Sequence, residues 1–257
     1  MPTPIDRKQK IVALLKGIET GDPNSVKVVN EQTYIQHNPQ TLEGGEGLAA
    51  LFKRLSQTNP SVNIVRIFED GDFVFGHTEY DFSSRRIGFE VFRFDGDYAV
   101  EHWDNIQARL GPNRSGRSMV DGTVAVKDLE KTEVNRKLVK AFIRNVVIPH
   151  NMSQIEQYVC ENSFVEHSPF SQDGLRELKK TLLQNTSTSE FKINYQTLHR
   201  VLAQGNFVLS VCEGFFDGIH SSFYDLFRVN NNKIVEHWDT RETVPEKSEW
   251  KNNNGKF

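Results

Sequence analysis

The spacing of apolar residues divides the chain into helical stretches followed by strand-like stretches, and this order occurs twice. Residues three and four positions apart lie on one side of an α-helix, so apolar residues at that spacing predict a helix with one buried face. The sequence contains four such stripes: Ile11, Leu14, Leu15 and Ile18; Leu48, Leu51, Phe52 and Leu55; Val134, Leu138, Ala141 and Phe142; and Leu175, Leu178 and Leu182. Ser153 and Glu156 have the spacing of a capping box, which predicts one more helix start in the second half.

β-branched and aromatic residues follow the helical stretches and are separated by turn residues. The predicted strands of the first half are 62–68, 73–80, 89–94 and 98–106. Turns at Asp70-Gly71 and Asp95-Gly96 separate them, and the second half repeats the pattern from Phe191 to Thr240, with a hairpin turn at 230–232. Helices followed by an antiparallel meander predict an α+β fold, in which the helices cover one face of a curved, mostly antiparallel sheet and leave a cone-shaped pocket between them.

An internal repeat sets the number of domains. The pentapeptide Val-Glu-His-Trp-Asp occurs at 100–104 and recurs unchanged at 235–239. The other matching segments keep the same order: 34–39 with 164–169, 66–74 with 200–208, and 92–96 with 227–231. We therefore predict two tandem domains, at 1–112 and 131–257, joined by a polar linker at 113–130.

Composition and charge exclude several classes of function. The chain has 257 residues, of which 37% are hydrophobic and 25% charged, as is typical of globular proteins. The formal net charge of −3 gives no cationic excess for nucleic-acid binding, and no run approaches the roughly 18 apolar residues of a membrane span. Cys160 and Cys212 make no disulfide framework, and the segment 1–10 lacks the apolar core of a signal peptide. We expect a cytoplasmic protein that binds neither nucleic acid nor membrane.

The repeated pentapeptide places its histidine and its aspartate on one face of a strand, because side chains alternate across a strand. In the first half these are His102 and Asp104, and Glu90 on the preceding strand lies within reach across a tight hairpin. A carboxylate beside an imidazole in an apolar cavity can act as a general acid–base pair, because burial raises the carboxylate pKa towards neutrality. The alternative is a structural network that orders the end of the sheet. The corresponding residues of the second half are His237, Asp239 and Asp225.

Further histidines and tryptophans are candidates for contact with a substrate. These candidate substrate-binding residues are His37, His77, Trp103, His167 and Trp238. The alternative for His37 and His167, each two residues before a proline, is a structural histidine that bonds a carbonyl at a helix end. His37, His77, His102 and Asp104 together offer the imidazole and carboxylate ligands that a metal site uses. No closely spaced pair of His or Cys residues supports such a site, so we predict no metal.

Four motifs of the first half resemble the SnoaL-like branch of the NTF2-like superfamily, whose members include polyketide cyclases. They are Tyr-Ile-Gln-His-Asn-Pro at 34–39, Glu-Asp-Gly-Asp-Phe-Val at 69–74, Phe-Arg-x-Asp-Gly at 92–96 and Glu-His-Trp-Asp at 101–104. The second half shows the same resemblance, and the segments 112–122 and 128–135 are similar to those of tandem two-domain members. The resemblance therefore extends over nearly the whole chain.

The resemblance implies two tandem cone-shaped barrels, each with a deep pocket and no cofactor. It implies acid–base chemistry on a small hydrophobic or carbonyl-containing metabolite, as in a cyclase, an aldol-type lyase or an isomerase. Asp104 and Asp239 would be the acid–base residues, Glu90 and Asp225 adjacent acids, and His102 and His237 orienting or proton-sharing groups.

The two halves also differ at positions near these residues, so their pockets need not be equally active. Gln36 corresponds to Glu166, Asn38 corresponds to Ser168, and His77 has no histidine counterpart. The superfamily is broad, and the alternative function is a non-catalytic module that binds a ligand or another protein. Because domains of this fold pair through their sheets, the resemblance also implies a pseudo-dimer within one chain, or a homodimer.

Overall fold

The computed structural model of the protein describes residues 6–185 and 191–257, which form two compact units. Unit 1 contains the chain up to Ala108 together with Pro245–Phe257, and unit 2 contains Arg109–Val244. Residues 1–5, part of the stretch considered above for a signal peptide, lie outside the described residues. Each unit is an α+β fold, as the sequence predicts, and its sheet has five strands where the sequence predicts four.

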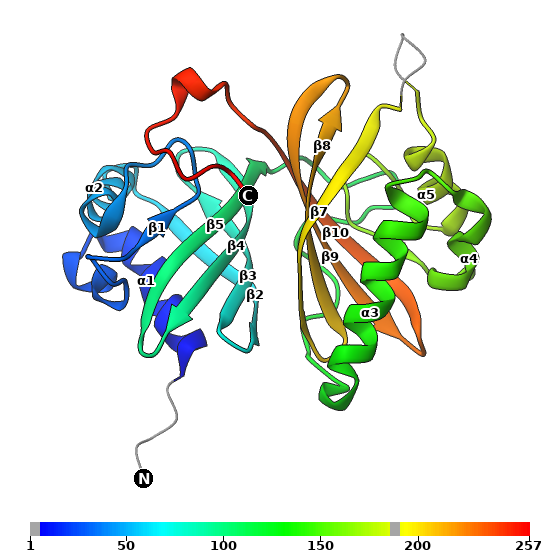
Figure 1. Ribbon diagram of the computed structural model, residues 1–257, viewed down its shortest axis with the longest axis horizontal. Coiled ribbons are helices and arrows are strands. Elements are labelled where there is room, and N and C mark those ends of the chain that lie inside the picture. The colour runs from blue at the N-terminus through cyan, green and yellow to red at the C-terminus, as the bar shows by residue number, and fades with distance from the viewer. Residues whose placement is uncertain (1–5, 186–190) are drawn as a thin grey trace. The chain divides into compact units, whose positions relative to one another are not determined.

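In unit 1 two helices lie against one face of the sheet (Figure 1). The first helix, α1 (Arg7–Thr20), begins where the Asp6 carboxylate accepts a hydrogen bond from the Gln9 N–H, and it ends at Gly21, whose φ of 67° favours glycine. A 3₁₀-helix (Pro23–Val28) and α2 (Gly44–Ser56) follow. The strands are β1 (Ile35–Gln36), β2 (Ser61–Asp70), β3 (Phe73–Asp81), β4 (Arg85–Asp95) and β5 (Tyr98–Ala108).

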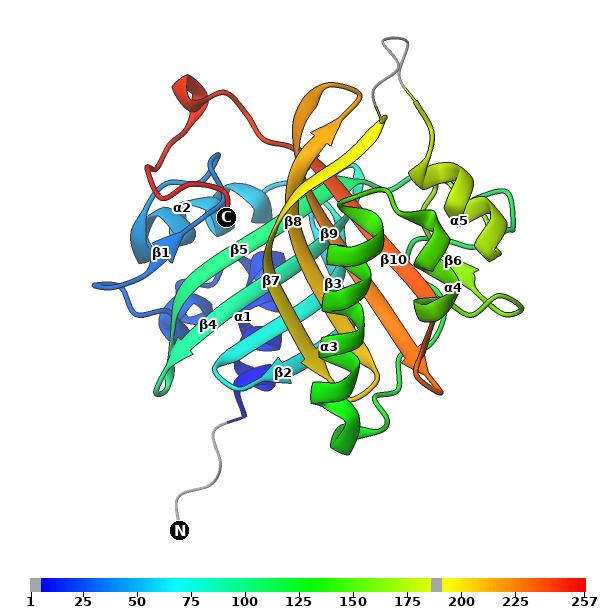
Figure 2. The same ribbon diagram turned by 45° about the vertical axis from the view of Figure 1, so that its right-hand side comes forward.

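Unit 2 repeats this order. Figure 2 shows α3 (Thr132–Phe142) running across the sheet, and a π-helical turn (Ile143–Val147) continues it. The shorter helices are α4 (Ile155–Tyr158), α5 (Leu175–Leu182) and the 3₁₀-helices Leu129–Lys131 and Met152–Gln154. The strands are β6 (Val165–Glu166), β7 (Ile193–Gln204), β8 (Phe207–Phe216), β9 (Ile219–Asn230) and β10 (Lys233–Thr243).

Both sheets have the same topology. The strand orders are β1-β5-β4-β3-β2 and β6-β10-β9-β8-β7, with four long antiparallel strands and one short strand parallel to the last. The parallel pairs place Gln36 beside His102 in unit 1 and Glu166 beside His237 in unit 2. The short strands therefore bring a polar side chain next to each histidine of the repeated pentapeptide.

The core of each unit lies between the helices and the sheet. In unit 1, Leu14 of α1 and Phe52 of α2 pack in one cluster with Phe92 of β4, and in unit 2 Val139 of α3 packs in a cluster with Phe227 of β9. Burying an apolar side chain of this size contributes about 1.5–3 kcal/mol, so the apolar stripes read from the sequence hold the helices on the sheets. Within 6–185 and 191–257, no helix is both long and apolar enough to span a bilayer.

The compact units divide the chain differently from the predicted ranges. The predicted linker 113–130 lies within unit 2, and the segment 245–257, predicted to end the second domain, lies within unit 1. Local composition identifies a segment as a linker but does not show which residues it bonds.

The predicted capping box is absent from the described residues. The Ser153 hydroxyl donates to the Asn151 side chain, and α4 begins at Ile155.

Candidate acid–base site

The histidine and the aspartate of the repeated pentapeptide lie on the helix-covered face of each sheet. In β5, His102 stacks on the core residue Phe92 at a centroid distance of 4.3 Å, and Asp104 shares its face. The antiparallel register places Glu90 directly opposite Asp104, and unit 2 has the same register. The structure thus brings together the three acid–base candidates predicted for each half.

In unit 2, His237 is held between two buried carboxylates. Its Nε2 lies 3.1 Å from Asp225 and its Nδ1 lies 2.9 Å from Glu166, while the Tyr195 hydroxyl donates to Asp225. Burial lowers the pKa of His237, but the two carboxylates outweigh burial and raise that pKa well above its ordinary value. Both N–H groups of the imidazolium are committed to these carboxylates, so His237 orients its neighbours and carries no proton to a substrate.

Asp239 of unit 2 keeps one oxygen atom available. Its Oδ2 accepts a hydrogen bond from the Ser168 hydroxyl at 3.1 Å, whereas its Oδ1 is buried and has no hydrogen-bond partner among the described residues. Burial raises the pKa of Asp239, His237 opposes this, and the charges of Glu166 and Asp225 add to it, so the pKa rises to about 6. Such a carboxylate is deprotonated at neutral pH and is a stronger base than an ordinary aspartate.

Unit 1 has the same arrangement with one negative charge fewer. His102 Nε2 lies 2.7 Å from Glu90, its Nδ1 lies 3.0 Å from the side-chain oxygen of Gln36, and the Tyr80 hydroxyl donates to Glu90 at 2.7 Å. Gln36 stands where unit 2 has Glu166. The histidine of unit 1 therefore faces one carboxylate and one neutral amide.

Asp104 of unit 1, unlike Asp239, is paired with an ammonium group. Lys256 Nζ lies 3.3 Å from its Oδ1, and the Asn38 side chain donates to its Oδ2 at 2.7 Å. Asp104 is 5% exposed and Lys256 is 3% exposed. Burial raises the pKa of Asp104, but Lys256 and His102 outweigh burial and hold that pKa below its ordinary value. Asp104 is therefore a weaker base than Asp239, and it is covered.

Lys256 belongs to the segment 245–257, which follows β10 in the chain and packs on unit 1; we refer to this segment as the unit 1 seal. Its Asn252 side chain is buried and donates to the carbonyls of Asn38 at 2.8 Å and of Thr41 at 2.9 Å. The seal therefore closes over the loop that carries the Asn38 partner of Asp104.

The segment 109–127 makes the corresponding contacts in unit 2, and we refer to it as the unit 2 seal. Its Asn113 side chain is buried and donates to the carbonyls of Glu166 at 2.7 Å and of Ser168 at 3.3 Å. Further along, Gly122 has a φ of +91°, and a Cβ at this position would overlap Glu236 and His167. Only glycine allows the seal to lie this close to β10.

The two seals differ at the residue that follows a shared histidine contact. In each seal one backbone carbonyl lies 2.9 Å from a histidine Nδ1: Gly255 meets His37 in unit 1, and Ser118 meets His167 in unit 2. The next residue is Lys256 in the first case and Met119 in the second, and both are buried. A methionine thioether carries no charge, so Met119 cannot neutralise Asp239 as Lys256 neutralises Asp104.

Four of the predicted substrate-binding residues lie on the other face of the sheets. His37 stacks on Trp103 at 4.6 Å and bonds Glu101 at 2.9 Å, and unit 2 repeats this arrangement. The unit 2 counterparts are His167, Trp238 and Glu236. Burial raises the pKa of Glu236, but His167 and Arg228 outweigh burial and lower that pKa to about 2. These groups form ion-pair networks away from the acid–base site.

His77 also lies outside the site. It stacks on Phe89 at 4.5 Å, accepts a hydrogen bond from Arg66 at 3.1 Å, and is completely buried. In the sheet register His77 pairs with Phe89 while Gly76 pairs with Glu90, so His77 points to the face opposite Glu90. The structure does not bring it to the acid–base residues.

Glu90, His102 and Asp104 present possible metal-ligand atoms within 4.8 Å of one another. These atoms already bond protein groups, however: Glu90 bonds Tyr80 and His102, and Asp104 bonds Lys256. The Lys256 ammonium supplies the positive charge that a cation would supply there. The arrangement therefore fits an internally satisfied network better than a metal centre.

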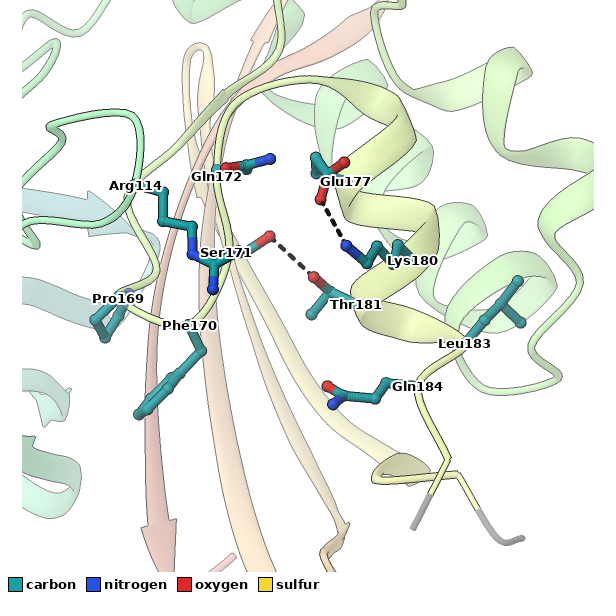
Figure 3. Close-up of a pocket in the computed structure, with 10 residues that line it drawn as sticks. All are labelled: Arg114, Pro169, Phe170, Ser171, Gln172, Glu177, Lys180, Thr181, Leu183 and Gln184. Carbon is teal, nitrogen blue, oxygen red and sulfur yellow. Dashed lines mark hydrogen bonds and ion pairs between the residues drawn. The ribbon is translucent and has the colours of Figure 1, made fainter.

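Among the described residues of unit 2, the cavity beside the acid–base residues is small, in contrast to the deep pocket that the resemblance implies. A cavity of about 30 Å³ reaches Tyr195, Asp225 and His237, and aromatic rings of Phe142 and Phe227 line it. That volume holds about one water molecule. A larger groove of about 590 Å³ lies on the surface beside α5, and Figure 3 shows the side chains that line it.

Sequence reasoning missed several partners of the acid–base residues. Alternation along the strand offered a signal for Gln36 and Asn38, because the two residues flank His37 and therefore point together to the opposite face. No local signal marks Lys256, which lies 152 positions from Asp104 in the sequence. Tyr80 was predicted only as part of a strand, since a tyrosine on a strand usually belongs to the core.

Solved structures similar to this chain are NTF2-like proteins and polyketide cyclase relatives. TsrD from Streptomyces laurentii is 18% identical, covering 42% of this chain and 92% of its own, with a TM-score of 0.36. IdmH from Streptomyces antibioticus, a candidate polyketide cyclase, is 15% identical. The match covers 38% of this chain and 90% of IdmH, with a TM-score of 0.34. An LEH-like epoxide hydrolase from M. tuberculosis is 19% identical. The match covers 39% of this chain and 81% of the hydrolase, with a TM-score of 0.34. No family model matches the chain, and no curated protein matches its sequence.

Proposed function

We propose that unit 2 is a cofactor-independent acid–base catalyst, in which Asp239 removes a proton from the carbon next to a carbonyl group of a small molecule. The observation that carries this proposal is the state of the Asp239 carboxyl group. Its Oδ1 is buried and lacks a hydrogen-bond partner among the described residues, while its Oδ2 is fixed by Ser168. A fixed carboxylate with an unused acceptor atom is suited to general-base catalysis.

The surrounding charges adjust the strength of this base. Asp225 and Glu166 hold the His237 imidazolium between them, and their negative charges also act on Asp239. In the reaction, the C–H bond breaks, its proton moves to Asp239 Oδ1, and its electron pair forms the enolate. The protonated Asp239 then returns a proton to the enolate, or the enolate attacks a second carbonyl group.

This first step is common to isomerases, aldol-type lyases and cyclases, so the proposal covers those reactions as one class. The small interior cavity, which reaches Asp225 and His237, favours a small substrate. Asp239 as a residue is partly exposed, although its Oδ1 is buried.

A deuterium-exchange experiment tests the proposal without a known substrate. The full chain is incubated in D₂O with a panel of small ketones, from acetone to cyclohexanone and 4-oxopentanoate, and ¹H NMR follows loss of the protons next to the carbonyl. We expect the protein to accelerate exchange of at least one ketone, and Asp239→Asn to reduce that rate by about 10²- to 10⁴-fold.

The matched control is Asp217→Asn, which makes the same change at an exposed turn of unit 2. It should exchange like the wild-type protein. Equal rates for the wild-type protein and Asp239→Asn with every ketone would contradict the proposal.

The occupied ring nitrogens of His237 favour a second candidate function, a module that binds a small ligand without converting it. His237 has both ring nitrogens occupied, and the cavity beside it holds about one water molecule. A ketone that raises the melting temperature of the protein but shows no exchange would favour this function.

A further inference from the structure

The surface groove beside α5 is formed by three segments of unit 2. Its walls come from the loop 169–172, from the segment 177–184, which includes the second half of α5, and from Arg114 of the unit 2 seal (Figure 3). The Ser171 hydroxyl lies 3.0 Å from the Thr181 hydroxyl, and this bond ties the loop to the helix. The groove volume of about 590 Å³ is within the range of sites that bind small molecules, roughly 300–1,000 Å³.

Arg114 brings to this groove a positive charge that no described residue neutralises. It is exposed, and within residues 6–185 and 191–257 it forms no hydrogen bond or ion pair. Arg117 of the same seal is different, because its guanidinium donates to Asp173 at 3.1 and 3.0 Å. An exposed guanidinium without an acidic neighbour presents its planar fork of donors to a ligand.

Lys180 adds a second cation to the groove. Glu177, the one acidic residue among the described residues that line the groove, lies 3.6 Å from Lys180. The Lys180 side chain is 74% exposed, so water screens most of this ion pair. With two cations and one anion along its walls, the groove carries a net positive charge and attracts an anion.

Phe170 and Leu183 give the groove an apolar wall. Their exposed fractions are 53% and 44%, and exposed apolar side chains gathered among polar ones are typical of ligand-binding grooves. The Arg241 guanidinium lies against the Phe170 ring, with its Cζ 4.7 Å from the ring centroid, and this contact restricts the ring. Aromatic rings pair in offset-stacked or edge-to-face arrangements, so an aromatic group fits against Phe170.

Unit 1 has a smaller groove that is built in the same way. It has a volume of about 220 Å³, and its walls include Arg54 of α2 and Lys251 of the unit 1 seal. Lys251 precedes the buried Asn252, and Arg114 follows the buried Asn113. Each seal therefore brings to its groove a basic side chain next to the asparagine that anchors the seal.

The two grooves differ in their aromatic content. Among the described residues, an aromatic side chain lines the groove of unit 2 and none lines that of unit 1. The position of Phe170, three residues after His167, is taken in unit 1 by Gln40, three residues after His37. The cations are thus common to both grooves, whereas the aromatic wall and the larger volume belong to unit 2.

We infer that the unit 2 groove binds a small aromatic carboxylate. The Arg114 fork binds the carboxylate with charge-assisted hydrogen bonds, Lys180 adds to the attraction, and the aromatic ring of the ligand packs against Phe170. This binding site goes beyond the proposed function and does not involve Asp239.

The test compares 3-phenylpropanoate with 3-phenylpropanamide, two molecules that differ in the negative charge. Titration calorimetry on the full chain should show saturable binding of the anion, about tenfold tighter than binding of the amide, since one charge-assisted hydrogen bond corresponds to at least that factor. Arg114→Gln should remove this preference by weakening binding of the anion. Arg176→Gln, the same change at an exposed arginine of α5 outside the groove, should bind like the wild-type protein.

The aromatic contact has its own comparison. The wild-type protein should bind 3-phenylpropanoate several-fold more tightly than 3-cyclohexylpropanoate, and Phe170→Leu should lose this preference. Arg114→Lys, which keeps the charge without the planar fork, should retain part of the affinity for the anion. Because Arg114 and Phe170 are exposed, these variants should fold, and circular dichroism checks that they do.

Each alternative outcome is decisive. Equal affinities for the anion and the amide, equal affinities of the wild-type protein and Arg114→Gln, or no binding of 3-phenylpropanoate would overturn the inference. Equal affinities for the phenyl and cyclohexyl anions would overturn its aromatic part. Binding of triglutamate in place of 3-phenylpropanoate would assign the groove to an acidic peptide and also overturn the inference. None of these ligands is a ketone, so the result is independent of deuterium exchange at Asp239.

Discussion

Asp104 in unit 1 and Asp239 in unit 2 end identical pentapeptides on equivalent strands, yet their electrostatic surroundings are opposite. Asp104 pairs with Lys256 and its pKa lies below the ordinary value, whereas the pKa of Asp239 is raised to about 6. The strand and the histidine are the same in both units, and an acid lies opposite each aspartate, Glu90 in unit 1 and Asp225 in unit 2. Burial and the charges of Glu166 and Asp225 raise the pKa of Asp239. In unit 1 the neutral Gln36 stands where unit 2 has Glu166, and the seal brings Lys256 to Asp104.

The comparison shows that a repeated motif does not by itself define a repeated activity. A motif fixes which side chains share a face, but the strength of a carboxylate base depends on the charges that other segments bring to it. In this protein those segments are far from the motif in the sequence. Four experiments test the difference between the two aspartates.

The largest expected effect is a difference in turnover between the two aspartate-to-asparagine variants. Asp239→Asn should lower the deuterium-exchange rate by about 10²- to 10⁴-fold, whereas Asp104→Asn should leave it within about twofold of wild type. Asp104 is covered by the unit 1 seal, so it does not meet a ketone. Equal losses in the two variants, measured by ¹H NMR in D₂O, would show that both units are active.

The next effect concerns the stability of unit 1. Lys256→Met, which introduces the residue of the unit 2 seal, leaves the buried Asp104 carboxylate without its cation and should cost about 3 kcal/mol. The pKa of Asp104 should rise, because the lysine charge that lowers it is gone. Urea unfolding measures the loss, and Asp104→Asn in the same chain should recover most of it. A Lys256→Met variant as stable as wild type would contradict the role of the ion pair.

The pH dependence of unit 2 provides a third test. Asp239 is disfavoured as an anion in the folded state, so its contribution to stability is lost as the pH rises from about 3.8 to about 6. Asp239→Asn should therefore be more stable than wild type at pH 7, by at most about 3 kcal/mol, and equally stable below pH 3.8. Deuterium exchange by the wild-type protein should rise through pH 6 and then level off. Thermal unfolding at both pH values and a rate profile measure these effects.

The smallest expected effect comes from Glu166→Gln, which gives unit 2 the residue of unit 1. Glu166 raises the pKa of Asp239, so its replacement should move the midpoint of the rate profile to lower pH, by less than about one unit. The pKa of His237 should fall in the same variant, and ¹H NMR of its ring protons measures it. A midpoint that moves to higher pH would contradict the charge balance described here.

Much of the fold could be predicted from local pattern. The four apolar stripes, the hairpin turns and the two copies of the meander follow from spacing and turn chemistry, which act over a few residues. Even the grouping of His102, Asp104 and Glu90 follows from strand alternation and one tight hairpin. The approach of Lys256 to Asp104 depends on the hydrogen bonds between the unit 1 seal and a loop distant from it in the sequence. No local periodicity predicts those bonds.

The same distinction explains what the sequence could not show about the site. Arg241 shares a face with Asp239 by simple alternation, but its support by Phe170 and Phe216 joins a loop and two strands. The small volume of the cavity beside His237 likewise depends on how the rings of Phe142 and Phe227 pack. The resemblance implies a deep pocket, and a motif does not report the side-chain volume that narrows the described cavity.

The two seals have a consequence for how the chain acquires its final form during synthesis. The segment 109–127 leaves the ribosome before the rest of unit 2, so unit 2 has its seal available from the start. The segment 245–257 is made only after the whole of unit 2, so Lys256 cannot pair with Asp104 until unit 2 has been synthesised. In a nascent chain unit 1 therefore folds first without its seal, and a chain truncated after β10 would lack that seal altogether.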